Sequence, residues 1–271
     1  MRFSSLLLVL LVSAAASLAQ PTVSNGGVLN GASFDKSGVG VTPGSLVSIF
    51  GSNLASANAQ ASSIPLSVSL GNVSVTFNGV SAPMLGTFPM ASGPNVDQLN
   101  VQLPWELTGA TVQVVVTNNG TKGPAQNVTL APVSPGIFSI PPGGGQAIAI
   151  NSDGSLAAPA GSIPGVATRP AKIGDSGGLM ILATGLGPVD SSIADGANSL
   201  DKLRHTTTTP TVLIGNVPAQ VVFSGLTPQF VGVNQVNVAI PAGTPTGNQV
   251  PIQIQMGGQT SSANVTIAVS Q

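Results

Sequence analysis

Residues 174–178 read GDSGG, the letters that surround the nucleophilic serine in trypsin-like proteases. A catalytic Ser176 would need a histidine as general base and an aspartate that orients this histidine. His205 is the single histidine of the chain and follows the serine, whereas the trypsin-like order places the histidine first. The chain contains no cysteine, so no disulfide can brace such a loop. We therefore interpret GDSGG as a loop that leads into a strand and expect no catalytic residue there.

A pair of carboxylates could hydrolyse glycosides if the two groups lay roughly 5 to 10 Å apart. Asp97 and Glu106 are the acids of the central part of the first half, and they flank the alternating segment 98–103. At roughly 3.3 Å per residue, an extended strand of this length separates them by about 20 Å. The sequence thus predicts that this pair is too far apart for the reaction.

The segment 187–205 carries the densest charge of the chain and includes Asp190, Asp195 and Asp201. Their carboxylate oxygens are calcium ligands by type, but their spacing matches no EF-hand loop. The interpretation that we favour is a solvent-exposed loop without a metal, containing a short helix over 199–204. The calcium site is kept as the alternative.

Trp105 is the sole tryptophan and follows the alternating segment, in the letters LPWEL. An exposed tryptophan could stack on a sugar ring, which makes it the candidate residue for glycan binding. Large aromatic side chains are mostly buried, however. The favoured interpretation is a tryptophan that caps a core or lies between two domains.

Apolar and polar residues alternate along much of the chain, which is the period of strands with one buried face. In the segment 72–77, for example, Val73, Val75 and Phe77 would share one face. The same pattern recurs over 98–104, 110–116, 235–241, 251–258 and 264–269. The sequence therefore predicts an all-β chain.

The two halves of the chain repeat each other, and three pairs of matching segments stand at one constant spacing. QLNVQLP at 98 matches QVNVAIP at 235, NVTLA at 127 matches NVTIA at 264, and NGVSAPM at 78 matches GNVPAQV at 215. In addition, GSLVSIFGSNL at 44–54 aligns with SGGLMILATGL at 176–186, so Asp175-Ser176 take the place of Pro43-Gly44. Three matches at one spacing indicate a tandem duplication.

Each copy is predicted to contain about seven strands separated by turn residues, as in a Greek-key β-sandwich. Pro132 and Pro135 interrupt the pattern between the copies. We therefore expect two sandwiches, over 20–133 and 134–271, joined by a short and stiff linker.

The segment 1–19 has the composition of a signal peptide. Arg2 provides the positive start, Leu6 to Val12 the apolar centre, and Ser17-Leu18-Ala19 the small residues of a cleavage site. The apolar run falls short of the roughly 20 residues that span a bilayer. We expect cleavage after Ala19, export from the cytoplasm, and no membrane span in the remaining chain.

Charged residues make up only 6% of the chain, compared with roughly 25% in ordinary soluble domains. After loss of Arg2, six basic and eight acidic residues would remain, for a net charge of about −2. This balance excludes a basic face for nucleic acid. With one histidine, a His-rich zinc site is not available within the chain, and we expect no cofactor.

Several segments resemble an uncharacterised family of domains at the C-termini of secreted acidobacterial proteins, the Solibacter-type C-terminal domain. The segments are PGSLVSIFGSNLA (43–55), VTFNGVSAPM (75–84), QLNVQLPWE (98–106), SPGIF (134–138), ATGLGPV (183–189) and VNQVNVAIPAG (233–243). Each half separately is similar to IPT/TIG immunoglobulin-like domains. The G-x-N-L turn of that pattern is met at 51–54, and Ala183 replaces its glycine in the second copy. The closing P-x-G is met at 241–243 but reads Pro104-Trp105-Glu106 in the first copy.

These motifs are features of a fold and carry over no catalytic residue, so the resemblance implies location and architecture. We expect a secreted, non-enzymatic protein at the cell surface or outside the cell, with the periplasm as another location. Its role would be structural, adhesive or protein-binding, and its partner an unidentified protein or polysaccharide. A carbohydrate-binding accessory protein and an enzyme with an unrecognised site are the alternatives.

The scarcity of charge also bears on the strand edges, which must be protected from pairing with other chains. We expect the two sandwiches to pack against each other, or the protein to associate with itself through strand edges.

Overall fold

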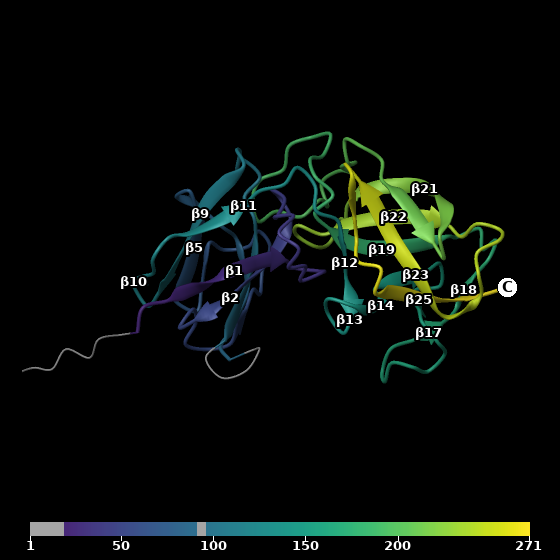
Figure 1. The fold of residues 1–271 in the computed structure, drawn as a ribbon, viewed down its shortest axis with the longest axis horizontal. Coiled ribbons are helices and arrows are strands. Elements are labelled where there is room, and N and C mark those ends of the chain that lie inside the picture. The colour runs from purple at the N-terminus through teal and green to yellow at the C-terminus, as the bar shows by residue number, and fades with distance from the viewer. Residues whose placement is uncertain (1–18, 91–95) are drawn as a thin grey trace, which may run out of the picture.

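The computed structural model describes residues 19–90 and 96–271, and every regular element in these residues is a strand. The predicted all-β class is confirmed. Of the predicted signal peptide, only Ala19 belongs to the described residues. Two bodies lie side by side, the first in purple to blue and the second in green to yellow (Figure 1). In the described part of the chain, no helix is long and apolar enough to cross a membrane.

The first half folds into two antiparallel sheets. The five-stranded sheet has the order β1 (Thr22–Asn30), β2 (Leu46–Ser52), β8 (Asp97–Gln102), β7 (Met84–Phe88), β3 (Ala59–Gln60). The six-stranded sheet has the order β10 (Thr121–Lys122), β9 (Thr111–Asn118), β5 (Val73–Phe77), β4 (Ser69–Leu70), with β11 (Gln126–Thr129) on β9 and β6 (Val80–Ser81) on β5.

Seven of these strands have four or more residues, as the sequence predicts. Four of them, β1, β2, β8 and β7, form one layer, and three, β5, β9 and β11, form the other. This four-plus-three order is that of an immunoglobulin-type sandwich. The predicted Ig-like fold is therefore confirmed for the first half.

The alternating residues supply the core between the two layers. Val73, Val75 and Phe77 are fully buried, as predicted, while the residues between them are partly exposed. In the neighbouring strand, Val116 lies opposite Val75 and is buried on the same side. A half-buried sheet gives this period because successive side chains point to opposite faces.

The second half forms one continuous 14-stranded sheet. Its main path is β13 (Ser139–Ile140), β14 (Gly145–Ala147), β25 (Val265–Ser270), β23 (Gly247–Met256), β20 (Thr211–Ile214), β21 (Val217–Leu226), β22 (Asn234–Ala239), β19 (Leu179–Thr184), β15 (Ala149–Asn151), β16 (Leu156–Ala157), β17 (Thr168–Arg169). Three short strands lie off this path: β12 (Gly136–Ile137) on β19, β18 (Ala171–Lys172) on β25 and β24 (Gln259–Thr260) on β23.

Two long strands, β21 and β23, join the layers of the second half. The start of β21 pairs with β20, and its remainder pairs with β22 across a register shift. Likewise, β23 pairs with β25 through its first part and with β20 through its second. Strands that change sheets in this way make the corners of a sandwich.

The strand pairings of the first half recur in the second. The β2–β8 pair corresponds to β19–β22, the β5–β9 pair to β20–β23, and the β9–β11 pair to β23–β25. The structure thus reproduces the repeat seen in the sequence as a repeat of topology.

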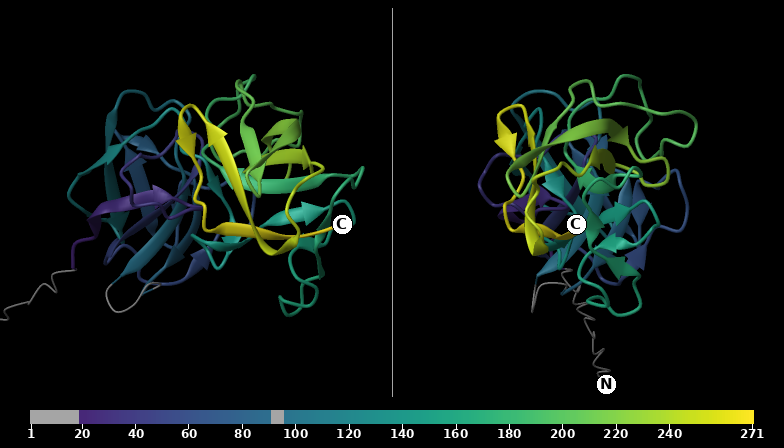
Figure 2. Two further views of the ribbon diagram at one scale, coloured as in Figure 1. Left: turned by 45° about the vertical axis from the view of Figure 1, so that its right-hand side comes forward. Right: turned by 90° about the vertical axis from the view of Figure 1, so that its right-hand side faces the viewer.

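Each half has its own cluster of buried apolar residues. The last strand of the first half ends at Thr129, and the first strand of the second begins at Gly136. We propose 20–133 and 134–271 as the two domains. Figure 2 shows the chain ending at the side of the second domain that faces away from the first.

The helix predicted over 199–204 is wrong, because the structure has bends and irregular backbone there. The Asp201 carboxylate instead forms two hydrogen bonds with Arg204, at 2.6 and 2.9 Å. Ser199 Oγ donates to the carbonyl of Lys202 at 2.8 Å. These local bonds close a compact turn, and so short a segment is not a stable helix without tertiary support.

Candidate functional site

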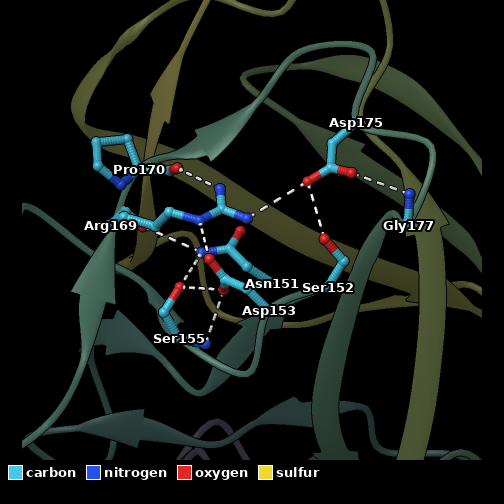
Figure 3. Close-up of polar contacts among 8 residues, drawn as sticks. All are labelled: Asn151, Ser152, Asp153, Ser155, Arg169, Pro170, Asp175 and Gly177. Atoms are coloured by element: carbon cyan, nitrogen blue, oxygen red, sulfur yellow. Dashed lines mark hydrogen bonds and ion pairs between the residues drawn. The ribbon is translucent and has the colours of Figure 1, made fainter.

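The GDSGG segment forms a turn that is held by its aspartate (Figure 3). Asp175 accepts hydrogen bonds from Gly177 N at 2.9 Å and from Ser152 Oγ at 3.1 Å, and it pairs with Arg169 at 3.4 Å. These contacts lower the pKa of Asp175, with the Gly177 N–H as the largest cause. Ser176 itself is exposed. The segment is the predicted lead-in to β19.

Arg169 links this turn to a second one. Its guanidinium also pairs with Asp153, whose carboxylate accepts from Ser155 N and Ser155 Oγ as well. The bond to Arg169 is the largest cause that holds the pKa of Asp153 well below its usual range. One cation thus ties two loops together at the outer end of the second domain.

Ser176 and His205 lie near different positions of the same sheet. Gly178, which closes the GDSGG segment, approaches the backbone of Val238, whereas His205 bridges to Gly225, which pairs with Gln235. The positions Gln235 and Val238 are about 10 Å apart along β22. The His205 ring contacts Asp190, with Nδ1 and Oδ2 3.1 Å apart. The structure therefore does not assemble a Ser–His–Asp triad from these residues.

The carboxylates of Asp97 and Glu106 lie at opposite ends of β8 and have different partners. Asp97 is buried and accepts hydrogen bonds from Leu54 N at 2.7 Å, Ala55 N at 3.3 Å and Met90 N at 2.9 Å. Glu106 is exposed and lies beyond the other end of β8, against Asp195. Asp97 therefore fixes a loop of its own domain, and the pair does not converge on a shared site.

The three aspartates of the predicted loop also have separate partners. Asp190 pairs with His205, Asp201 with Arg204, and Asp195 accepts from Trp105 N at 3.0 Å. Over residues 19–90 and 96–271, no group of three His, Asp or Glu side chains could hold a metal ion. Asp195 is half-buried, which differs from the exposed position expected for it.

Trp105 lies at the contact between the two domains and is partly buried. One face of its ring covers Gly44, where a Cβ atom would come within about 2.4 Å of the ring carbons. The indole Nε1 is buried without a hydrogen-bond partner. Gly185, Leu186 and Asn234 of the second domain line the same small hollow. This is the interdomain position favoured over a free sugar-stacking platform.

Buried polar groups join the two domains. Asn30 Nδ2 donates to Ser134 O at 2.7 Å, and Leu46 N donates to Thr184 Oγ1 at 3.0 Å. The side chains of Asn30 and Thr184 are almost completely buried. Because unpaired buried polar groups are costly, these bonds favour a single arrangement of the domains. This is the expected packing between the sandwiches.

A groove of about 710 Å³ lies between the domains, next to these contacts. Its walls are mostly aliphatic and aromatic, and the lining contains no charged side chain. The first domain contributes Leu46, Leu66, Leu85, Phe88 and the segment 60–64, with Asn100; the second contributes Phe138, Ile148, Leu182, Phe230, Val231 and Val233. A mostly apolar lining with a few polar groups is typical of ligand-binding sites.

The groove does not follow from the sequence. Two of its residues, Ile64 and Phe230, are large apolar side chains that are 44% and 52% exposed. Ile64 lies in the segment SSIP and Phe230 in PQFVGV, outside the alternating pattern. An apolar side chain within a proline-containing loop is the one local signal that could have marked them.

Comparison with known proteins supports the fold. Residues 176–269 match the model of the IPT/TIG domain, so the second domain is similar to that immunoglobulin-like group. A search of curated proteins found no match.

Three of the solved structures that the chain matches are the following. A Bacteroides ovatus protein of a mixed-linkage glucan utilisation locus, SGBP-B, in complex with a mixed-linkage heptasaccharide, is 12% identical; 86% of this chain and 43% of that chain are covered, with a TM-score of 0.31. The tandem Ig repeats of Dlar are 11% identical, with coverage of 93% and 99% and a TM-score of 0.23. The Yersinia pseudotuberculosis adhesin InvE is 15% identical, with coverage of 86% and 57% and a TM-score of 0.23.

These TM-scores are low, and the chain spans less than half of the SGBP-B structure. The fold assignment therefore rests on the strand order and on the IPT/TIG match. Together they show immunoglobulin-like domains in an all-β chain.

Proposed function

We propose that this protein is an extracellular, non-enzymatic binding module that takes up an uncharged, extended polypeptide segment in the groove between its two domains. The groove is the single observation that carries the proposal. Its volume lies within the range of about 300 to 1,000 Å³ that ligand sites occupy. The export signal expected in residues 1–19 supports the extracellular location.

The chemistry of the walls decides between occupants. A sugar bound between these aliphatic side chains would lose the hydrogen bonds that its hydroxyl groups make with water. The groove walls would not replace these bonds, so binding would cost free energy. The apolar side chains of a polypeptide gain free energy in the same place. The lack of charge in the lining fits a partner segment without charge.

The segment 60–64 supplies the polar groups that an extended backbone needs. Gln60, Ser62 and Ser63 lie in the groove lining beside the exposed Ile64. Amide and hydroxyl groups can bond to main-chain N–H and C=O groups of any sequence. Recognition would then combine apolar side-chain burial with sequence-tolerant backbone contacts.

A polysaccharide is the second candidate, because the half-exposed Phe230 lines the same groove as this polar segment. A phenyl ring can stack on the apolar face of a sugar. In this alternative, Phe230 takes the role that the sequence suggested for Trp105.

We also propose, more specifically, that the chain belongs to the Solibacter-type C-terminal domain family. The support is the set of motifs over 43–55, 98–106 and 233–243. The function proposed above does not depend on this assignment.

The proposal can be tested with the variants Phe230→Ser and Val222→Ser. Both side chains are exposed, at 52% and 64%, and Phe230 lines the groove whereas Val222 does not. The probes are capped peptides composed of Ala, Leu, Val, Ser and Thr, together with a panel of neutral polysaccharides, at about pH 5.

We expect the wild type to retain a subset of the peptides and Phe230→Ser to bind them about tenfold more weakly, since a partly buried phenyl group contributes more than about 1 kcal/mol. Val222→Ser should bind like the wild type. Retention of polysaccharide alone would favour the second candidate. If both variants lost peptide affinity equally, the groove would not be the binding site.

A further inference from the structure

A loop of the second domain reaches across the domain boundary and docks on the first domain. Gly196 N donates to Gln102 Oε1 at 2.7 Å, and Gly196 O accepts from Leu66 N at 2.8 Å. Gly196 is buried and has a φ of +76°, and a Cβ atom there would approach the Leu66 backbone to 2.9 Å. Glycine is therefore required for this close approach.

Asp195 lies next to this anchor and faces a carboxylate of the other domain. Its Oδ1 accepts from Trp105 N at 3.0 Å, which places the side chain beside Glu106, the residue that follows Trp105. The Trp105 N–H and the Glu106 carboxyl are the groups of the first domain that act on Asp195. In the loop itself, Arg204 is bonded to Asp201, Ser199 and the carbonyl of Ser192, and Lys202 is exposed.

Two carboxylates that meet at a partly buried interface are stable together when they share a proton and repel each other when both are ionised. We propose that Glu106 and Asp195 form an acid-closed latch, which fastens the loop 187–205 to the first domain at acidic pH and releases it near neutral pH. This inference does not depend on the identity of the groove's occupant.

The direction follows from linkage between protonation and docking. Burial, followed by Glu106, raises the pKa of Asp195 to about 6, whereas a solvated aspartate has a pKa of about 3.9. The docked loop therefore binds the proton more tightly than the undocked loop. The stability that the docked loop gains from this proton is complete below about pH 4 and is lost as the pH rises through about 6.

The size of the effect follows from the same two values. A pKa that is higher by about 2 in the docked loop corresponds to about a 100-fold change in the ratio of docked to undocked loop. Because Asp195 is only half-buried, solvent reduces this, and we expect a change between about tenfold and 100-fold.

The sole tryptophan provides the readout, since Trp105 is bonded to Asp195 and the protein has no tyrosine. Its fluorescence emission is measured from about pH 4 to about pH 8 in EDTA. We expect a shift to longer wavelength near pH 6 in the wild type, as the ring gains contact with water. Asp195→Asn keeps the acceptor for Trp105 N but cannot ionise, so its emission should not change near pH 6.

Two further variants keep the outcome unambiguous. Glu106→Gln removes the repulsion and should move the transition to lower pH. Asp190→Asn, the same substitution in the same loop, should keep the wild-type transition, because Asp190 pairs with His205. Circular dichroism at each pH checks that the variants are folded.

The latch is overturned if the wild-type emission is constant between about pH 4 and about pH 8, or if Asp195→Asn shows the same transition. It is also overturned if the transition appears only when calcium replaces EDTA, since a cation and not a proton would then close the pair.

Discussion

In the first domain, β6 and β7 are separate strands that belong to different sheets, whereas β21 runs unbroken through the equivalent positions of the second domain. Pro83 stands at the break, and Gln220 stands at the matching position of the second copy. Proline has no N–H for the ladder and restricts the residue before it. Pro83 is thus a difference between the copies at the place where the corner breaks, whereas Pro218, at the start of β21, leaves that strand continuous.

The first strand differs between the domains as well. β1 is one strand with a register shift between Val23 and Val28, and it pairs with β2 alone. In the second copy, β12 and β15 both pair with β19, and β13 and β14 lie between them in sequence. β14 crosses to pair with β25. The segment that corresponds to β1 therefore pairs with both layers of the second domain, whereas β1 pairs with one layer of the first.

The largest difference between the domains is in the connection that follows β2 in the first domain and β19 in the second. In the first domain, the connection after β2 supplies the groove segment 60–64; in the second, the connection after β19 carries the latch residue Asp195. The two connections meet where Leu66 N donates to Gly196 O. Equivalent loops on equivalent frameworks thus diverged to make the interdomain contact, in agreement with the general role of loops.

Substitution of equivalent core residues gives the largest expected effect. Phe77 and Ile214 occupy matching positions and are completely buried. We expect Phe77→Ala to lower the free energy of unfolding by about 4 kcal/mol and Ile214→Ala by about 3 kcal/mol, because each leaves a cavity. Urea denaturation measures both. A loss below about 1 kcal/mol at either position would contradict the equivalence of the cores.

The buried acceptor side chain at the start of β8 should matter more than its counterpart at the start of β22. Asp97 accepts from three backbone N–H groups, whereas its counterpart Asn234 accepts from Leu186 N. We expect Asp97→Ala to cost about 3 kcal/mol and Asn234→Ala about 1 kcal/mol, since donors are left unpaired in each case. Equal costs, measured by the same denaturation, would show that the two turns are held alike.

Exchange of the corner residues tests the role of Pro83. Gln220→Pro should destabilise the second domain by about 1 to 2 kcal/mol, because it removes a donor from the middle of β21. The reverse change, Pro83→Gln, should alter stability by less than about 1 kcal/mol. Hydrogen exchange of residues 217–226 locates the change. Unaltered protection in Gln220→Pro would show that another feature keeps β21 continuous.

The smallest effect is expected for Ser176→Ala in the GDSGG turn. The hydroxyl is on an exposed residue, and Asp175 provides the bonds of this turn. Unfolding free energy should change by less than about 0.5 kcal/mol. Asp175→Ala is the matched comparison and should cost more. If Ser176→Ala cost more stability than Asp175→Ala, the Ser176 hydroxyl would have a structural role that its exposed position does not indicate.

Much of the fold could be predicted because its signals are local. The alternation at Val73, Val75 and Phe77 follows from the period of a half-buried strand, and the constant spacing of the matching segments reveals the duplication. The two-residue strands carry no period. The sequence does not distinguish the turn at Asp201 and Arg204 from a helix, because close hydrogen bonds can favour either structure.

The candidate site could not be predicted in the same way. Asn30 bonds to Ser134, and Trp105 to Asp195, across separations of 104 and 90 residues. No sequence pattern relates such residues, because docking of one domain on another is decided by complementary surfaces. The groove and the latch both arise at that contact, so the alternation that revealed the strands did not reveal them.

The groove exists only if the two domains keep one fixed arrangement. Small-angle X-ray scattering of residues 20–271 at about pH 5 tests this directly. We predict a profile that fits the single two-domain body of Figure 1. A profile that requires two domains moving independently at this pH would contradict the account.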